Sequence, residues 1–294
     1  MLEPERDQLV KISIVVPAKN EASALVRLLP GLKESVPGAE IIVVNDGSTD
    51  NTSEVCANNG VIEILHLYSK GNGAAIKAGA RAAEGETIVF MDGDGQHSPE
   101  DVHRLIECLR SGYDMVVGAR GFESQASFGR GVANTLYNKL ASYITGHRVK
   151  DLTSGFRAVS REKFLHFLYL LPNGFSYPTT STMAFFRAGY SVSYVPILAG
   201  KRKGSSHIRP LNDGLRFLLI LFKIGTLYSP LKIFFPVSLA IFSVGIGYYG
   251  YTFFTMGRFT NMSALMFTTS FIIFMVGLVS EQITTLMYKD EEKE

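Results

Sequence analysis

Short apolar runs alternate with amphipathic stretches through roughly the first 120 residues. Runs of about four to eight apolar residues are typical of strands that are buried on both faces. The sequence therefore predicts strands at residues 12–16, 40–45, 61–67, 87–91 and 114–118. Leucines at helical spacing between residues 25 and 32 predict a helix after the first strand. This order predicts an α/β fold, with a mostly parallel sheet and helices on both faces.

Fewer elements can be predicted from the pattern beyond this region. A helix is expected to begin near residue 98, with Ser98 as N-cap, Pro99 as first helical residue and Asp101 as the acid of the cap. An amphipathic helix is expected at residues 132–144 and a further strand at residues 191–196.

The C-terminal part of the chain contains two long stretches without charge, at about residues 233–257 and 259–280. A membrane-spanning helix needs about 20 apolar residues, so each stretch is long enough to cross a bilayer. The short connection at Arg258 predicts an antiparallel hairpin. The alternative is a pair of buried helices in a soluble domain. The charged N-terminus and the short apolar run after it do not resemble a secretion signal.

Charge and hydropathy together suggest how the chain is divided. We expect a soluble domain at residues 1–210, an interface helix at 211–230, a transmembrane hairpin at 231–288 and a tail at 289–294. The second segment is amphipathic, which is typical of a helix in the membrane interface, although an ordinary packed helix is the alternative. Basic residues cluster before the first span, whereas the hairpin turn carries only Arg258. This excess predicts that the soluble domain lies on the cytoplasmic face of the cell's inner membrane. The net charge of +2 does not indicate nucleic acid.

The most informative motif is Asp92-Gly93-Asp94, which follows a buried strand directly. Carboxylate oxygens suit Mg²⁺ or Mn²⁺, and Gln96 adds another oxygen donor. A calcium loop that starts at Asp92 is excluded, because His97 and His103 occupy its glycine and glutamate positions. An ordinary acidic turn remains the alternative.

Two more polar clusters follow predicted strands, at residues 17–21 and 45–50. Ligands of parallel sheets bind outside the carboxyl ends of the strands, so three clusters at one edge indicate a site. Turn and cap chemistry is the alternative for each cluster alone. The glycine-rich segment 70–76 has Ile76 at the third glycine position of a dinucleotide fingerprint. We therefore interpret it as a turn into a helix near the site.

Five segments together resemble a known family: Val16–Glu21, Val44–Asp50, Met91–His97, Asp151–Arg157 and Lys201–His207. They are similar to family 2 glycosyltransferases with the GT-A fold. The resemblance is strongest to the polyprenyl-phosphate branch, which includes dolichol-phosphate mannosyltransferases and bacterial lipid-phosphate glucosyltransferases. The last segment departs from the branch pattern, because His207 stands where a lysine is usual.

The resemblance implies a nucleotide-diphosphate sugar donor, linked to UDP or GDP. The residues expected to hold its nucleotide are Pro17, Ala18, Asn20, Glu21, Asp46, Ser48, Lys70 and Asp92. Asp92, Asp94 and Gln96 are expected to bind Mg²⁺ or Mn²⁺, with Asp94 as the principal ligand. The metal would neutralise the leaving diphosphate. Attack from the opposite face of the sugar would invert the anomeric centre.

The implied acceptor is a polyprenyl phosphate, such as undecaprenyl or dolichyl phosphate. Guanidinium groups hold phosphate in a bidentate geometry. The residues expected to bind the acceptor phosphate are Arg120, Arg130, Arg157 and Arg202. Asp151 is expected to be catalytic together with Asp92 and Asp94, either by orienting the acceptor or as a base. A salt bridge to Asp151 is the alternative for Arg157.

The expected function is therefore inverting transfer of one sugar to a polyprenyl phosphate at a membrane. The chain has no tryptophan, so it lacks the Gln-x-x-Arg-Trp element of processive members, which favours a single transfer. One alternative is transfer to a hydroxyl of a glycolipid or protein, which would need a stronger base. Another is a silent membrane scaffold. Gly245, Gly247 and Gly250 would permit close helix approach in a homo-oligomer.

Overall fold

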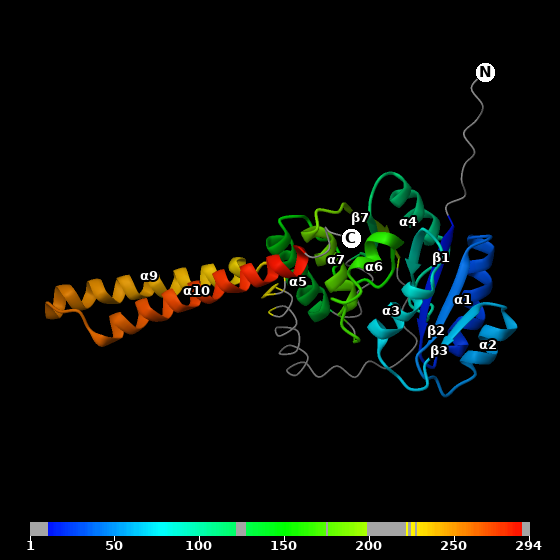
Figure 1. Cartoon of the computed structure of the whole chain (residues 1–294), viewed down its shortest axis with the longest axis horizontal. Coiled ribbons are helices and arrows are strands. Elements are labelled where there is room, and N and C mark those ends of the chain that lie inside the picture. The colour runs from blue at the N-terminus through cyan, green and yellow to red at the C-terminus, as the bar shows by residue number, and fades with distance from the viewer. Residues whose placement is uncertain are drawn as a thin grey trace, which may run out of the picture. The chain divides into compact units, whose positions relative to one another are not determined.

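The computed structural model describes residues 11–121, 128–174, 176–198, 222, 225–226 and 228–289. The chain forms two compact units. The first comprises residues 1–140 and 147–206, and the second comprises residues 141–146 and 207–294. Figure 1 shows the sheet in the first unit and a long helical hairpin in the second.

The described part of the first unit contains a seven-stranded sheet in the order β3-β2-β1-β4-β6-β5-β7. Its strands are β1 (Ile12–Ala18), β2 (Glu40–Asn45), β3 (Ile62–Leu65), β4 (Thr87–Phe90), β5 (Met115–Arg120), β6 (Arg157–Ser160) and β7 (Val192–Ile197). All neighbouring pairs are parallel except the two made by β6, which is antiparallel to β4 and β5. The five predicted N-terminal strands and the strand near residue 192 are confirmed.

The pattern did not predict β6, the strand between β4 and β5. It is four residues long, and its first residue is an arginine paired with Phe90 on one side and Val117 on the other. A short strand that begins with a charged residue gives no apolar signal. Its position brings the segment that ends at Arg157 beside the end of β4, which leads to Asp92.

Helices connect the strands. They are α1 (Ala22–Ser35), α2 (Thr52–Asn58), α3 (Asn72–Ala82), α4 (Asp101–Arg110), α5 (Phe128–Thr145), α6 (Arg161–His166) and α7 (Tyr177–Arg187). The expected cap at Ser98 is wrong. The Ser98 carbonyl accepts a hydrogen bond from the Asp101 amide, as in a turn, and α4 begins at Asp101 with no side-chain cap.

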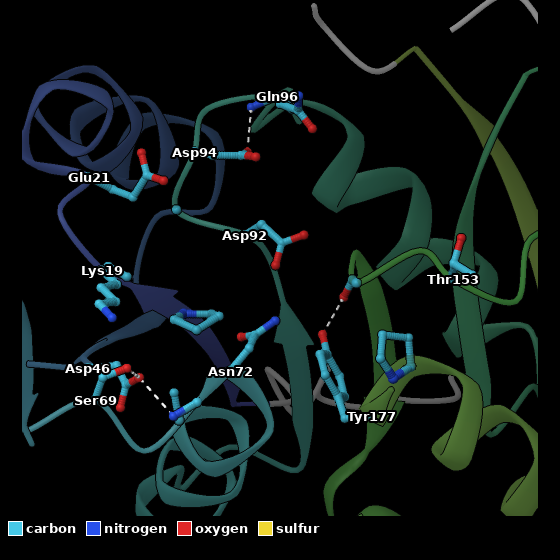
Figure 2. Close-up of a pocket in the computed structure, with 17 residues that line it drawn as sticks. Lys19, Glu21, Asp46, Ser69, Asn72, Asp92, Asp94, Gln96, Thr153 and Tyr177 are labelled. Atoms are coloured by element: carbon cyan, nitrogen blue, oxygen red, sulfur yellow. Dashed lines mark hydrogen bonds between the residues drawn. The ribbon is translucent and has the colours of Figure 1, made fainter. Parts of the chain in front are cut away.

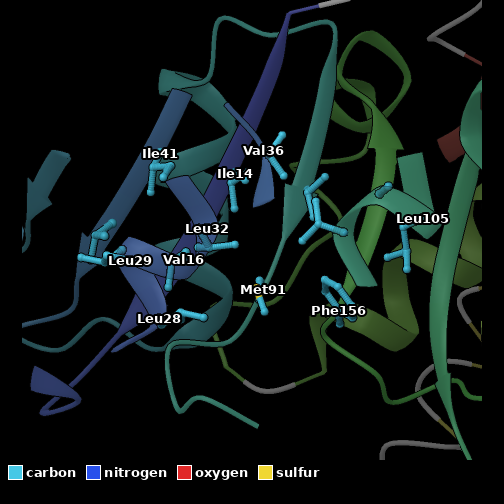
Figure 3. Packing of buried hydrophobic residues seen from close by; sticks show 14 of the residues in the cluster. Ile14, Val16, Leu28, Leu29, Leu32, Val36, Ile41, Met91, Leu105 and Phe156 are labelled. Atoms are coloured by element: carbon cyan, nitrogen blue, oxygen red, sulfur yellow. The ribbon is translucent and has the colours of Figure 1, made fainter. Parts of the chain in front are cut away.

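The sheet is covered on both faces, as predicted. On one face, Ile14 and Val16 of β1 pack with the buried leucines of α1 and with α4 (Figure 3). On the other face, α3 approaches so closely that a Cβ on Gly79 would lie 2.3 Å from Val15 Cγ1. Burial of each large apolar side chain contributes roughly 1.5–3 kcal/mol. The core therefore holds the carboxyl ends of the strands, where the polar clusters lie.

In the second unit, α9 (Pro230–Met256) and α10 (Asn261–Lys289) form an antiparallel hairpin (Figure 1). Gly257 ends α9 in the left-handed conformation, with φ of 64°. Both helices are long and apolar enough to cross a membrane. Gly245 and Gly277 make close approaches within the hairpin. A Cβ on Gly245 would lie 3.1 Å from Met266 Cβ, and one on Gly277 would lie 2.7 Å from Phe234 Cβ.

Polar contacts fix the start of α9. The Leu231 amide donates to the Glu281 carboxylate at 3.2 Å, which places negative charge at a helix N-terminus. Pro236 lacks an N–H, so the Lys232 carbonyl has no i+4 partner within the helix. That carbonyl accepts a hydrogen bond from the Tyr143 hydroxyl at 3.4 Å instead. The predicted interface helix at 211–230 lies mostly outside the described residues.

Candidate active site

A cavity of about 520 Å³ lies at the carboxyl ends of β1, β2 and β4. Residues from six segments line it: 17–21, 46, 69–75, 92–96, 153–155 and 177–178. The first four segments follow strands or open α3, as the sequence predicted. Figure 2 shows their side chains around one opening. The three polar clusters therefore meet at a single site.

Asp92, Asp94 and Gln96 lie on one side of the cavity, along the loop after β4 (Figure 2). Backbone hydrogen bonds from Met91 to Val15 and from Gly93 to Pro17 continue the β1–β4 pairing into this loop. The backbone N–H of Gln96 donates to Asp94 Oδ1 at 3.1 Å, which closes a tight turn. The carboxylates of Asp92 and Asp94 and the side-chain amide of Gln96 thus line one cavity.

This oxygen donor set fits a hard divalent cation. The described residues contain no group of three or more His, Cys, Asp or Glu side chains that could complete a metal shell. Mg²⁺ usually takes one or two carboxylates and completes its shell with water and substrate phosphates. Asp92 and Asp94 match that pattern, and water and substrate phosphates would fill the remaining coordination positions.

His97 supports this loop from behind. Its ring is buried and stacks on Phe156 with centroids 4.9 Å apart. Nε2 lies 3.9 Å from Asp92 Oδ2, which is too long for a hydrogen bond, and Nδ1 is buried with no partner among the described residues. Burial lowers the pKa of His97, so the imidazole is neutral near pH 7.

Asp46 is buried and serves as the anchor of the segment that leads into α3. Its carboxylate accepts four hydrogen bonds, from His66 Nδ1, Ser69 Oγ and the amides of Lys70 and Gly71, at 2.7–2.9 Å. Burial alone would raise the pKa of Asp46, but these hydrogen bonds outweigh it and lower the pKa to about 2. Asp46 therefore organises the side of the cavity at the start of α3, and its oxygens are already occupied.

The two loops after β1 and β2 hold each other. The Asn20 amide donates to Ser48 Oγ at 3.0 Å, and Asn20 Oδ1 accepts from the Thr49 amide at 2.8 Å. Asn20 has a φ of 56°, a conformation that asparagine tolerates better than most residues. Neither Asn20 nor Ser48 is among the residues that line the cavity, so the structure places both as loop supports.

The described lining differs from the expected donor set in other residues as well. Pro17, Ala18 and Glu21 line the cavity as expected, but Lys70 does not. The Lys70 amine instead lies 5.9 Å from the centroid of the Tyr68 ring. Lys19, Ser69 and Asn72 line the cavity and were not predicted (Figure 2). Each lies in the same loop as a predicted residue, and this proximity in sequence was the one indication that it could line the cavity.

Asp151 pairs with Arg120. Asp151 Oδ2 accepts from Arg120 Nε at 2.8 Å and Oδ1 accepts from Nη2 at 3.1 Å, in a bidentate geometry. The amides of Thr153 and Ser154 also donate to Oδ1 at 3.1 Å. Burial opposes ionisation, but the Arg120 contacts and the amides lower the pKa of Asp151. The partner of Asp151 is thus Arg120, and the alternative of an Arg157 salt bridge is wrong.

Arg157 is fully buried and does not line the cavity. Its guanidinium donates to the carbonyls of Ser154 and Pro178 and to the hydroxyls of Ser181 and Thr182. It therefore lies behind the cavity, where the predicted contact with an acceptor phosphate has no room. The side chain of Arg130 and all of Arg202 lie outside the described residues, so their roles stay predictions.

Comparison with known proteins adds the deciding observation. Residues 13–168, more than half of the chain, match the family described as glycosyl transferase family 2. The chain belongs to glycosyl transferase family 2. Residues 229–286 of this family 2 transferase match a second family, described as the GtrB C-terminal hairpin. That match covers α9 and most of α10, and it supports assignment of the family 2 transferase as a membrane protein.

Curated relatives of the family 2 transferase are also glycosyltransferases. Glycosyltransferase AglJ of Haloferax volcanii is 27% identical over 80% of this chain and 79% of that protein. The undecaprenyl-phosphate 4-deoxy-4-formamido-L-arabinose transferase of Photorhabdus laumondii is 33% identical over 53% of this chain and 50% of its own length. The chain thus spans about half the length of this second relative.

Solved structures confirm the GT-A fold of the family 2 transferase. Glucosyl-3-phosphoglycerate synthase from Mycobacterium tuberculosis, in complex with Mn²⁺, UDP-glucose and phosphoglyceric acid, aligns with a TM-score of 0.59. It shares 23% identity and covers 73% of this chain and 79% of that one. At this identity the likeness shows the fold alone.

Proposed function

We propose that the transferase moves one sugar, with inversion, from a nucleotide-diphosphate sugar to a polyprenyl phosphate at a membrane. One observation carries the proposal: a carboxylate-lined GT-A cavity and an apolar two-helix hairpin belong to the same chain. The names of the relatives support it, since one of them acts on undecaprenyl phosphate.

The loop after β4 would hold Mg²⁺ or Mn²⁺ through Asp94, with Asp92 and Gln96 assisting. A divalent cation supplies charge neutralisation for the departing nucleotide diphosphate. The Gln96–Asp94 turn and the β1–β4 pairing keep the oxygens in place before the donor arrives. Such preorganisation lowers the cost of binding.

The nucleotide would lie against the loops after β1 and β2 and the start of α3. Pro17, Ala18, Lys19 and Glu21 would contact it on one side, and Ser69 and Asn72 on the other. Asp46 contributes indirectly, because it fixes Ser69 and the Lys70 and Gly71 amides. UDP and GDP both remain candidates.

A phosphate acceptor needs little help from a base. The second pKa of a phosphomonoester is about 6, so its oxygen is already ionised near neutral pH. Arg120 is held by Asp151 with 29% of its side chain exposed, which leaves part of the guanidinium accessible to an anion. Arg130 and Arg202 are proposed as further contacts. Asp151 thus serves to orient Arg120 in this mechanism.

The hydroxyl-acceptor alternative has less support. It would need a strong base, and Asp151 was the predicted candidate. Its lowered pKa and its hydrogen bonds to Arg120 and two amides oppose proton abstraction. The scaffold alternative is also weakened, because the cavity keeps Asp92 and Asp94.

We further propose that the hairpin anchors the chain in the inner membrane, with the catalytic unit on the cytoplasmic face. The excess of Lys and Arg before the first span supports this orientation. A homo-oligomer stays a proposal. Gly247 and Gly250 leave open space beside α9, whereas Gly245 is used within the hairpin.

The test is a transfer assay with membranes that contain the full chain. Labelled UDP- and GDP-sugars are offered with polyprenyl phosphate, with Mg²⁺, Mn²⁺ or EDTA. The variants are Asp94→Ala and, as a matched control, Asp101→Ala, which removes a carboxylate paired with Arg104 on α4. We expect a lipid-phosphate sugar from one donor, lost with EDTA and in Asp94→Ala and retained in the control.

Each other outcome revises the proposal. Product that survives EDTA and Asp94→Ala would exclude the metal-dependent mechanism. Failure of every donor, with nucleotide binding intact, would exclude polyprenyl phosphate as the acceptor.

A further inference from the structure

We propose that Arg157 is a positioning residue, whose guanidinium joins Ser154 to the first turns of α7 and so holds the side of the cavity that faces Asp92. We call this side, made of Thr153, Gly155 and Tyr177, the Gly155 wall. The inference rests on the proposed function only in taking this cavity as the donor site.

The Gly155 wall lies directly against the metal loop. A Cβ on Gly155 would lie 2.8 Å from Asp92 Oδ2 and 3.2 Å from the Tyr177 hydroxyl. Gly155 is therefore the residue type that leaves Asp92 its space. A small displacement of this wall would change the room available to the Asp92 carboxylate.

Hydrogen bonds from three groups fix the backbone of the wall. Asp151 accepts from the amides of Thr153 and Ser154. Arg157 donates to the Ser154 carbonyl, and the Tyr177 hydroxyl donates to the Gly155 carbonyl at 3.0 Å. The spacing of Asp151, Ser154, Gly155 and Arg157 in the sequence thus has a geometric reason: the two charged ends of the motif hold its middle.

Arg157 also holds the second element of the wall. Its Nη1 donates to Pro178 O at 2.9 Å, Ser181 Oγ at 2.7 Å and Thr182 Oγ1 at 3.1 Å, all in α7. Its carbon Cζ lies 5.7 Å from the Tyr177 ring centroid. One planar group therefore connects α7 to the loop before β6.

Burial of the Arg157 side chain costs desolvation free energy. A fully buried cation loses its hydration, and none of the hydrogen-bond acceptors of Arg157 among the described residues is a carboxylate. Burial lowers the pKa of Arg157, but an arginine remains charged. The charges of Asp151 and Asp92 act in the opposite direction and favour the charged guanidinium. A group that positions the Gly155 wall must lie behind it, and the Arg157 guanidinium lies there.

The geometry predicts a selective effect. The Arg157 guanidinium contacts Ser154, α7 and the Met115 sulfur on β5, whereas the opposite side of the cavity is held by Asp46. Loss of Arg157 should therefore disturb the metal loop and leave metal-independent nucleotide contacts intact. Lysine should not replace it, because a single amine cannot reach Ser154 and α7 together.

The experiment compares Arg157→Met, Arg157→Lys and Ser181→Ala in the full chain. Lys163→Met is the control, because Lys163 pairs with Asp114 and does not line the cavity. Binding of UDP and GDP is measured by calorimetry with Mn²⁺ and with EDTA. Hydrogen exchange of residues 152–157 is measured at equal folded fraction. Since exchange needs no ligand, it tests the inference even where a transfer assay fails.

Both Arg157 variants should weaken Mn²⁺-dependent nucleotide binding about tenfold or more, as loss of a group that supports a metal ligand does. Binding in EDTA should change less than about twofold by the same reasoning, and exchange at 152–157 should rise. Ser181→Ala should change Mn²⁺-dependent nucleotide binding and hydrogen exchange in the same direction, but by less. If the Arg157 variants do not fold, the Ser181→Ala result alone tests the inference. Lys163→Met should shift neither.

Restoration by Arg157→Lys would overturn the bridging role in favour of charge alone. Equal effects in Arg157→Met and Lys163→Met would overturn it in favour of general stability. Absence of lipid-linked product, with the binding pattern above intact, would reject the proposed acceptor and leave this inference standing.

Discussion

The two sides of the cavity are each held by a buried charged group, and the two charges have opposite sign. On the side proposed for the nucleotide, the Asp46 carboxylate accepts hydrogen bonds from four groups. On the opposite side, the Arg157 guanidinium donates to four. The difference is that a carboxylate can be neutralised by acid and tolerates backbone amides as partners, whereas arginine keeps its charge and can join elements that are further apart.

The comparison teaches how each side can be disturbed. The Asp46 partners lie within a stretch of 25 residues after β2, so the nucleotide side is a local structure. The Arg157 partners come from the loop before β6 and from α7. We therefore expect changes at Asp46 to act mainly on stability and changes at the Gly155 wall to act mainly on function.

The largest expected effect is that of Asp46→Ala. Removal of the carboxylate leaves two amides, a hydroxyl and an imidazole without their acceptor, which should lower the free energy of unfolding by about 3 kcal/mol. Denaturant unfolding of the full chain in detergent measures it. Glu107→Ala, at an exposed position of α4, should stay within about 0.5 kcal/mol of wild type. A similar change in both variants would contradict the anchor role.

Acid should disturb the two sides unequally. The pKa of Asp46 is about 2 in the folded chain, below its ordinary value of 3.8. Its stabilisation is therefore present above pH 3.8 and is lost as pH falls towards about 2, with a size of about 2 kcal/mol. Arg157 does not titrate in this range. Unfolding of wild type and Asp46→Asn at pH 2 to 6 measures the difference, and parallel curves would refute it.

A smaller effect is expected from Gly155→Ala. The new methyl group would meet Asp92, so kcat/KM should fall about tenfold while the melting temperature changes little. Steady-state transfer with Mn²⁺ measures it. Gly174→Ala is a matched control, because a Cβ there meets nothing within 4 Å. Full activity of Gly155→Ala would show that Asp92 does not need this space.

The smallest effect is expected from Tyr177→Phe. It removes the hydrogen bond to the Gly155 carbonyl and should cost about 1 kcal/mol of stability. Hydrogen exchange should rise at residues 153–156 and stay unchanged at residues 69–71 on the nucleotide side. Tyr113→Phe, at an exposed position, is the control. Equal exchange on both sides of the cavity would contradict their independence.

The sequence was sufficient to predict which strand ends meet at the cavity, although Asn20, Ser48 and Lys70 of the expected donor set do not line it. Continuous apolar runs show where buried strands end, and carboxylates at those ends must share one edge of a parallel sheet. The hairpin was predictable for a similar reason, since long uncharged stretches leave few alternatives. In both regions, local composition determines the position.

The Gly155 wall was less predictable. The resemblance singled out Asp151 and Arg157, and it placed Arg157 among the arginines expected to contact the acceptor phosphate. Its burial depends on β6, a four-residue strand with no apolar signal. It also depends on α7, whose Ser181 and Thr182 hydroxyls come within reach of Arg157 only when the chain folds. The pairing of Asp151 with Arg120 joins residues 31 apart in sequence and also depends on tertiary structure.

The reciprocal contacts of Gly245 and Gly277 have a mechanical consequence. Each helix of the hairpin offers a glycine to the other, and the side chains of Met266 and Phe234 occupy those spaces. Turning one helix about its axis by one residue, about 100°, would move these side chains away from the glycines and against bulkier positions. We therefore expect the two helices to move as one unit and to resist rotation against each other.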